Sequence, residues 1–212
     1  MSEAPFDTLN LGRLTADDPE HVAENRLRLC TEVGTDPREL RYGRQQHGPV
    51  VRRAEGRGRP GDGLWTDTRG EPLLVFTADC LPIVIARADG ERPAIAALHV
   101  GWRGLLGGIV EAGAAALGPT TSLEAVIGPG IGPCCYEVGE EVAKPFRERF
   151  GDGIVRNSHL DLWSAAEHAL CEAGVAKVAR LDLCTACNPE LFFSHRRDGR
   201  HTGRQGLIAY VT

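Results

Sequence analysis

Lysine, methionine and long apolar runs are scarce in this sequence, and each scarcity removes a class of protein. Lys144 and Lys177 are the only lysines, and the formal net charge is −5, which argues against general nucleic-acid binding. No apolar run is long enough to cross a bilayer. The opening residues lack the basic and apolar regions of a signal peptide. We therefore expect a cytoplasmic protein with neither a membrane nor a nucleic acid as its partner.

Internal repeats, coiled-coil heptads and low-complexity tracts are also missing, so the 212 residues read as one domain, 1–212. Hydrophobic residues make up 42% of the chain and charged residues 25%, as in ordinary globular proteins. The seven cysteines are an odd number. In a reducing compartment they are better explained as thiols, ligands or core residues than as disulfides.

Short β-branched runs alternate with helical patterns along the chain. An acidic cap, Asp18-Pro19-Glu20, starts a helix with Val22, Ala23, Leu27 and Cys30 on one face. Residues 34–59 read as a loop, 87–92 as a polar turn, and 105–117 and 160–173 as helices. The predicted strands are residues 73–76, 83–86, 94–98, 125–128, 177–183 and 205–211. This order predicts an α+β (α/β-like) fold, with a mixed β-sheet flanked by helices.

Two reactive side chains lie beside predicted strands. Cys80 falls in a break between strands, because Pro82 cannot donate to a central ladder. His99 ends the next strand, just before a turn into a helix. Strand ends that lead into helices are where open α/β sheets place their chemistry. A thiol and an imidazole delivered to such a place are half of a catalytic site.

Three kinds of chemistry could use these groups. With His47 they form an N/S/N set that suits zinc and leaves a fourth position open, although the spacing alone does not require it. Without a metal, Cys80 is a candidate nucleophile, His99 its base and Asp79 the orienting group. Blue copper is disfavoured because its axial ligand is often methionine, and the sequence has only Met1.

Four other cysteines permit a structural zinc or redox interpretation. Cys134 and Cys135 are adjacent, and Cys184 and Cys187 have C-x-x-C spacing. Four thiols could close a tetrahedral site. Adjacent cysteines are awkward ligands, however, and the C-x-x-C pair lacks its usual zinc-ribbon partner. Packing in the core or in a helix turn is the favoured interpretation.

A basic segment follows near the carboxyl terminus, from Ser194 to Arg204. Its guanidinium groups suit phosphate or carboxylate, and a solvated hairpin explains the segment equally well. The Gly-Pro-Gly-Ile-Gly-Pro run at 128–133 matches neither a P-loop nor a dinucleotide fingerprint.

Taken together, the motifs resemble one protein family over nearly the whole chain. The segments that carry the resemblance are residues 5–12, Asn25-Arg26, Gln46-His47-Gly48, 77–82, 99–104, 127–138, Cys184-Thr185, 192–198 and Thr202-Gly203-Arg204. The family is known as laccase-domain or polyphenol oxidase proteins, and also as multifunctional purine nucleoside phosphorylases and peptidoglycan editing factors.

The resemblance implies a zinc site at His47, Cys80 and His99. It implies phosphorolysis of adenosine, inosine and S-methyl-5'-thioadenosine, with some adenosine deamination, so that a purine nucleoside and phosphate are the expected partners. It also implies a fold similar to the catalytic domain of cytotoxic necrotizing factor toxins. Those toxins are Cys/His deamidases, so a metal-free hydrolase acting on peptidoglycan precursors stays open, as does an inactive binding domain.

For phosphorolysis, phosphate must lie close to the anomeric carbon of the ribose. The candidate phosphate ligands are Arg103, Arg196, Arg197 and Arg204. Asp79 is a candidate acid or base, or a hydrogen-bond partner of a ligand histidine. Family members usually carry Thr-x-Arg-x-Gly-Gly-x-Ser ahead of Pro5, and this chain starts after that segment. We expect weaker phosphate binding if that arginine takes part.

Overall fold

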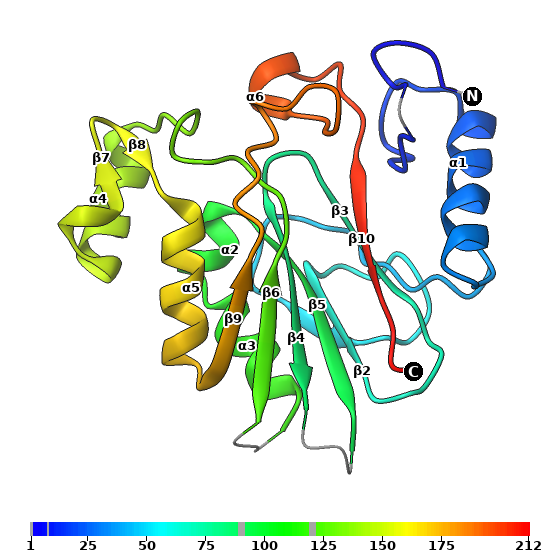
Figure 1. Ribbon diagram of the computed structural model, residues 1–212, viewed down its shortest axis with the longest axis horizontal. Coiled ribbons are helices and arrows are strands. Elements are labelled where there is room, and N and C mark those ends of the chain that lie inside the picture. The colour runs from blue at the N-terminus through cyan, green and yellow to red at the C-terminus, as the bar shows by residue number, and fades with distance from the viewer. Residues whose placement is uncertain (1, 8, 89–91, 119–121) are drawn as a thin grey trace.

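A computed structural model describes residues 2–7, 9–88, 92–118 and 122–212. Its centre is a mixed six-stranded sheet in the order β1-β2-β5-β4-β6-β9 (Figure 1). The six strands are β1 Val51–Arg53, β2 Gly63–Thr66, β4 Leu81–Arg87, β5 Ala94–Val100, β6 Leu123–Ile127 and β9 Val175–Arg180. The outer pairs β1–β2 and β6–β9 are parallel, and the three inner pairings are antiparallel. This confirms the predicted α+β fold with a mixed sheet.

Six α-helices and four further strands lie outside this sheet in the described chain. The helices are α1 Pro19–Glu32, α2 Trp102–Leu106, α3 Ile109–Ala116, α4 Glu140–Phe150, α5 Leu162–Glu172 and α6 His195–Asp198, with a 3-10 turn at Asp152–Ile154. Two further antiparallel pairs join β3 Leu73–Thr77 to β10 Gln205–Ala209, and β7 Val155–Arg156 to β8 His159–Leu160.

The two faces of the sheet are covered by different layers, as Figure 1 shows. In β4, Ile83 and Ile85 pack against the helices, while Val84 and Ala86 belong to a second apolar cluster with β3 and β10. This division follows from the period-two alternation of side chains along a strand. Helix α1 covers the far side of the β3–β10 pair, where Cys30 packs against Leu74.

The predicted first helix is confirmed, but its buried face is different. Asp18 caps α1 by accepting the backbone N–H of Glu20. Leu27 is 48% exposed, and Ala23 is also exposed. Asn25 and Arg26 are buried in their place, because they donate hydrogen bonds to the carbonyls of residues 10 and 11. Val22 and Cys30 are buried as predicted, so polar contacts and apolar burial together fix this face.

Other boundaries differ from prediction for local reasons. Pro82 lies inside β4, opposite His99, because a proline is tolerated near the start of a strand. The helix predicted over 105–117 is two helices, α2 and α3, separated at Gly108, whose φ of 87° a right-handed helix cannot include. The predicted loop 34–59 contains β1. The turn predicted at 87–92 falls partly outside the described residues.

Within the described residues, every helix is too short or too polar to cross a membrane.

Candidate metal centre and its arginine-lined cavity

The pairing of β4 with β5 brings Cys80 close to His99. His99 pairs directly with Pro82 across β4 and β5, and Cys80 precedes Pro82 by two residues. Cys80 itself lies in the bend that leads into β4. The register of β4 on β5 therefore sets this bend beside His99, which alternation places on the face of the sheet that looks away from α3 and α5.

His47 reaches the pair from a loop that one carboxylate organises. Asp62 immediately precedes β2 and accepts the backbone N–H groups of Gln46, His47 and Gly48 at 2.8–3.0 Å. His47 itself has a positive φ of 60°, a conformation that this set of hydrogen bonds holds in place. Asp62 is 2% exposed.

The three side chains converge on one point. One ligand atom from each of His47, Cys80 and His99 lies within 4.8 Å of the other two. The two imidazole rings meet edge to face with their centroids 4.8 Å apart. A Cβ at Gly101 would come within 3.0 Å of Cys80 Sγ, so glycine keeps this space open. Two nitrogens and one sulfur at this spacing fit a zinc ion with one remaining position.

Asp62 also sets the orientation of His99. Its Oδ1 lies 2.8 Å from His99 Nδ1, so the ring carries a proton on Nδ1 and presents Nε2 to Cys80. Burial opposes ionisation of this carboxyl, but hydrogen bonds from His99 and from the Gly48 and Gln46 amides outweigh it and lower the pKa of Asp62. Sequence reasoning missed Asp62, because the residue lies 37 positions from its histidine.

The charges and hydrogen bonds around Cys80 favour its thiolate form. Burial alone would raise the pKa of Cys80, but His99 and hydrogen bonds from His47 bring it down to about 6. Burial likewise would lower the pKa of His99, but Cys80 and Asp62 raise it to about 9. Because metals bind the thiolate form of cysteine, the protein environment prepares Cys80 as a ligand or as a nucleophile.

Asp79 lies beside the cluster with both oxygens engaged. Its Oδ1 accepts the Thr185 hydroxyl at 2.7 Å, and its Oδ2 accepts the Arg196 backbone N–H at 2.6 Å. Its φ of 96° is rare for a residue with a side chain, and such conformations cost about 1–3 kcal/mol. The carboxylate beside His99 is Asp62 and not Asp79, for which a histidine partner was one of two predicted roles.

The cluster opens into a cavity of about 670 Å³. Arg103, Arg196 and Arg204, which the sequence predicted as phosphate ligands, all line it. Arg103 stacks on Trp102, with its Cζ 4.1 Å from the ring centroid, and the Cζ of Arg196 lies 5.3 Å from the centroid of the Tyr136 ring. Burial lowers the pKa of Arg204, while the nearby charges of Cys80 and Asp79 oppose that shift.

Arg197 is placed differently. Its guanidinium donates to the carbonyls of Thr185 and Phe192 and pairs with Asp198, and the residue is not part of the cavity lining. The cavity instead includes three arginines that sequence reasoning did not single out, namely Arg13, Arg26 and Arg44. The ion pairs found among the described residues involve none of the six cavity arginines. Their positive charge is therefore not neutralised by a carboxylate, although Arg26, Arg196 and Arg204 each donate to backbone carbonyls.

The chain is similar to known proteins over all or nearly all of its length. A family model described as multi-copper polyphenol oxidoreductase laccase matches residues 1–212. A purine nucleoside phosphorylase of Xylella fastidiosa (strain Temecula1 / ATCC 700964) is 38% identical over 232 residues, which span 100% of this chain and 88% of that protein. A protein named adenosine deaminase RL5, from an unknown prokaryotic organism, is 33% identical over 225 residues, which span 94% of this chain and 85% of that protein. The crystal structure of YlmD from Geobacillus stearothermophilus superposes with a TM-score of 0.91 at 32% identity, and the match covers 100% of this chain and 88% of that one.

Proposed function

Because this chain belongs to the multi-copper polyphenol oxidoreductase laccase family, we propose that it is a zinc-dependent purine nucleoside phosphorylase with adenosine deaminase side activity. Its substrates would be adenosine, inosine and S-methyl-5'-thioadenosine, each with phosphate. The observation that carries the proposal is the convergence of His47, Cys80 and His99 on the wall of an arginine-lined cavity. Cavities of this volume hold drug-sized ligands, so a nucleoside and a phosphate both fit. A cytoplasmic location stays a prediction.

His47, Cys80 and His99 would hold the zinc ion. When bound, zinc supplies a Lewis acid that stabilises developing negative charge on an oxygen. Zinc fits better than a multi-copper centre, because the close His/Cys/Asp/Glu groups found among the described residues contain only two imidazoles. The sole methionine, Met1, lies outside those residues.

The chain's own groups would carry the remaining steps. In phosphorolysis the bond from ribose C1' to the purine nitrogen breaks, a phosphate oxygen bonds to C1', and the base leaves with a proton. Arg103, Arg196 and Arg204 would bind and orient the phosphate, which positions one oxygen for attack. Asp62 would keep the proton on His99 Nδ1. Asp79, whose oxygens are both occupied, would position Arg196 instead of transferring a proton.

Purified protein assayed on the three nucleosides, with and without phosphate, tests this proposal. We expect release of free base that requires phosphate, and formation of inosine from adenosine without it. Cys80→Ala should remove both the zinc of this site and phosphorolysis, whereas Cys171→Ala, at an exposed thiol on α5, should match the parent. A Cys80→Ala protein that released hypoxanthine from inosine at the parent rate would end the proposal.

One observation favours a second candidate function. Cys80, His99 and Asp62 have the arrangement of a nucleophile, its base and an orienting carboxylate, with the pKa of Cys80 lowered to about 6. A thiol hydrolase acting on amides would use this triad without a metal. Its activity on an amide would survive a chelator and need no phosphate, whereas the proposed phosphorolysis would be lost without either zinc or phosphate.

A further inference from the structure

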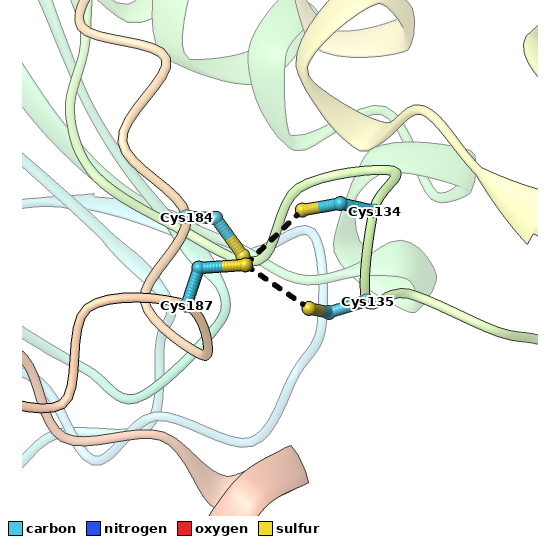
Figure 2. Close-up of side chains that lie close together, drawn as sticks. All are labelled: Cys134, Cys135, Cys184 and Cys187. Atoms are coloured by element: carbon cyan, nitrogen blue, oxygen red, sulfur yellow. Dashed lines mark hydrogen bonds between the residues drawn. The ribbon is translucent and has the colours of Figure 1, made fainter.

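A second group of four cysteines lies outside the cavity and has no part in the function proposed above. Cys134 and Cys135 lie on the loop that follows β6, and Cys184 and Cys187 lie on the loop that follows β9 (Figure 2). Their side chains point toward one another, and one sulfur from each lies within 4.8 Å of the other three. The two loops meet because β6 and β9 are parallel neighbours whose carboxyl ends lie at the same edge of the sheet.

Packing, which the sequence favoured for these residues, does not explain the cluster. Cys134 and Cys187 are exposed and Cys135 is half-buried, so only Cys184 is in the core. A free cysteine is among the most often buried residue types. Three thiols that are exposed or half-buried, gathered from two loops around a buried fourth, therefore need another explanation than apolar burial. In the sequence, Cys184 and Cys187 lacked the second cysteine pair of a zinc ribbon. In the structure that place is taken by Cys134 and Cys135, some 50 residues earlier.

The spacing of the sulfurs suits a tetrahedral ion. Cys187 Sγ lies 3.5 Å from Cys134 Sγ and 3.3 Å from Cys135 Sγ. Zinc–sulfur bonds of about 2.3 Å in a tetrahedron place the sulfurs about 3.8 Å apart. The observed separations are close to that value, so small side-chain rotations would complete the geometry. A disulfide would require one pair to approach to about 2.05 Å and would leave two thiols over.

The backbone around Cys184 is arranged as it is around a thiolate ligand. The Gly132 backbone N–H donates to Cys184 Sγ at 3.3 Å, and the Cys187 backbone N–H donates to the same sulfur. Amide donors stabilise negative charge on sulfur. Arg197, whose guanidinium donates to the Thr185 carbonyl at 3.0 Å, adds positive charge beside this turn. Four thiolates around a divalent cation leave two negative charges, which these donors offset.

We propose that Cys134, Cys135, Cys184 and Cys187 form a four-thiolate zinc site that fastens the loop after β6 to the loop after β9. The two loops are already joined by backbone bonds, in which Thr185 N donates to Gly130 O and Gly130 N donates to Leu183 O. The site lies one residue from Thr185, which donates to Asp79 beside the catalytic cluster. The ion is structural: all four of its positions are taken by protein sulfur.

Zinc content measured in a series of variants tests this site separately from the first one. Protein purified with a reductant and with Zn²⁺ present is analysed for bound zinc after removal of free ion. In the Cys80→Ala background, which removes the cavity site, we expect about one zinc per chain. Adding Cys187→Ser should reduce that value to near zero, while adding Cys171→Ser should leave it unchanged. Because this comparison measures only zinc content, its result does not depend on whether Cys80→Ala abolishes nucleoside cleavage.

Thiol labelling in the unaltered chain covers the case in which the Cys187→Ser protein does not fold. Zinc should slow alkylation of Cys134, Cys135 and Cys187 at least tenfold, and a chelator should restore it, whereas the exposed Cys171 should label equally in both conditions. Equal labelling with and without zinc, or a disulfide linking Cys187 to Cys134 or Cys135 in protein purified with reductant, would overturn the proposal.

Discussion

Asp62 shows how one buried carboxylate can organise a whole site. It joins the loop that carries His47 to the strand that carries His99, using three backbone N–H donors and one imidazole N–H. The positions of His47 and His99, the two proposed metal ligands, therefore both depend on Asp62. Partners of this kind, which orient metal ligands, typically change metal affinity by 10- to 100-fold when they are replaced.

We predict that Asp62→Asn weakens zinc binding at the cavity site by about 10- to 100-fold. The amide keeps the size of the carboxylate but loses its charge, and its NH₂ group cannot accept the loop N–H groups. Competition with a chelator of known affinity measures the change, and a melting curve taken in parallel reports any loss of folding. Asp67→Asn, at a half-exposed surface carboxylate paired with Arg53, is the matched control. Unchanged zinc affinity in a folded Asp62→Asn protein would mean that the histidines are oriented by other contacts.

For single residues, local sequence patterns predicted the functional side chains whose positions depend only on the strand that they belong to or adjoin. Cys80 was predicted in a break between strands and His99 at the end of the next strand, and the structure places Cys80 in the bend just before β4 and His99 near the end of β5. Asp62 and the cysteine cluster depend on pairings between distant segments. His99 and Asp62 are 37 residues apart, and Cys135 and Cys187 are 52 apart. No local spacing carries information about such pairs.

Among the secondary-structure elements, the junction between β5 and α2 leaves little space beside the cluster of His47, Cys80 and His99. Gly101 ends the strand and caps the helix, with ordinary extended φ and ψ of −88° and 172°. Its lack of a side chain leaves room for Cys80 Sγ and His47 Cδ2, which a Cβ would approach to 3.0 and 3.3 Å. The need for glycine here is therefore a matter of space and not of backbone conformation.

Gly101→Ala should consequently lower zinc occupancy and catalytic turnover without unfolding the protein. The added methyl group pushes the sulfur and one imidazole away from their shared point, and a displacement of about 1 Å at an active site can cost about 100-fold in rate. Gly153→Ala, where a Cβ would meet nothing within 4 Å, is the control. The measurements are zinc content, kcat on inosine and the melting temperature. Parent-level zinc and kcat in Gly101→Ala would show that the cluster can shift to accommodate the methyl group.

Strands and helices with a clear local sequence pattern were predictable. The elements that the sequence analysis did not predict correctly have physical causes. The strands β3 and β5 are apolar runs, and the structure confirms them. Strand β1, Val51–Arg53, has two arginines in three residues and is stabilised by its pairing with β2 and not by its own composition. The break between α2 and α3 depends on Gly108 adopting a positive φ, which a glycine permits but does not require.

On the scale of the whole molecule, charge is unevenly distributed. The chain carries a net charge of −5, yet six arginines line one cavity and the acidic residues form their ion pairs elsewhere in the described chain. A phosphate ion would be repelled weakly at long range, where salt screens the field, and attracted strongly once inside. Affinity for phosphate should then depend on individual arginines far more than on net charge.

Arg103→Gln provides the sharpest test of this distribution. Its guanidinium is held in place by stacking on Trp102, so it is preorganised to donate to an anion. Loss of one charge-assisted hydrogen bond to phosphate should raise the KM for phosphate by about 10- to 100-fold while the KM for inosine changes much less. Arg28→Gln removes the same unit of charge on the exposed face of α1, where Arg28 pairs with Glu24, and should leave both constants unchanged. If the two variants raised the KM for phosphate equally, net charge rather than the cavity arginines would control phosphate binding, and the assignment of Arg103 would be wrong.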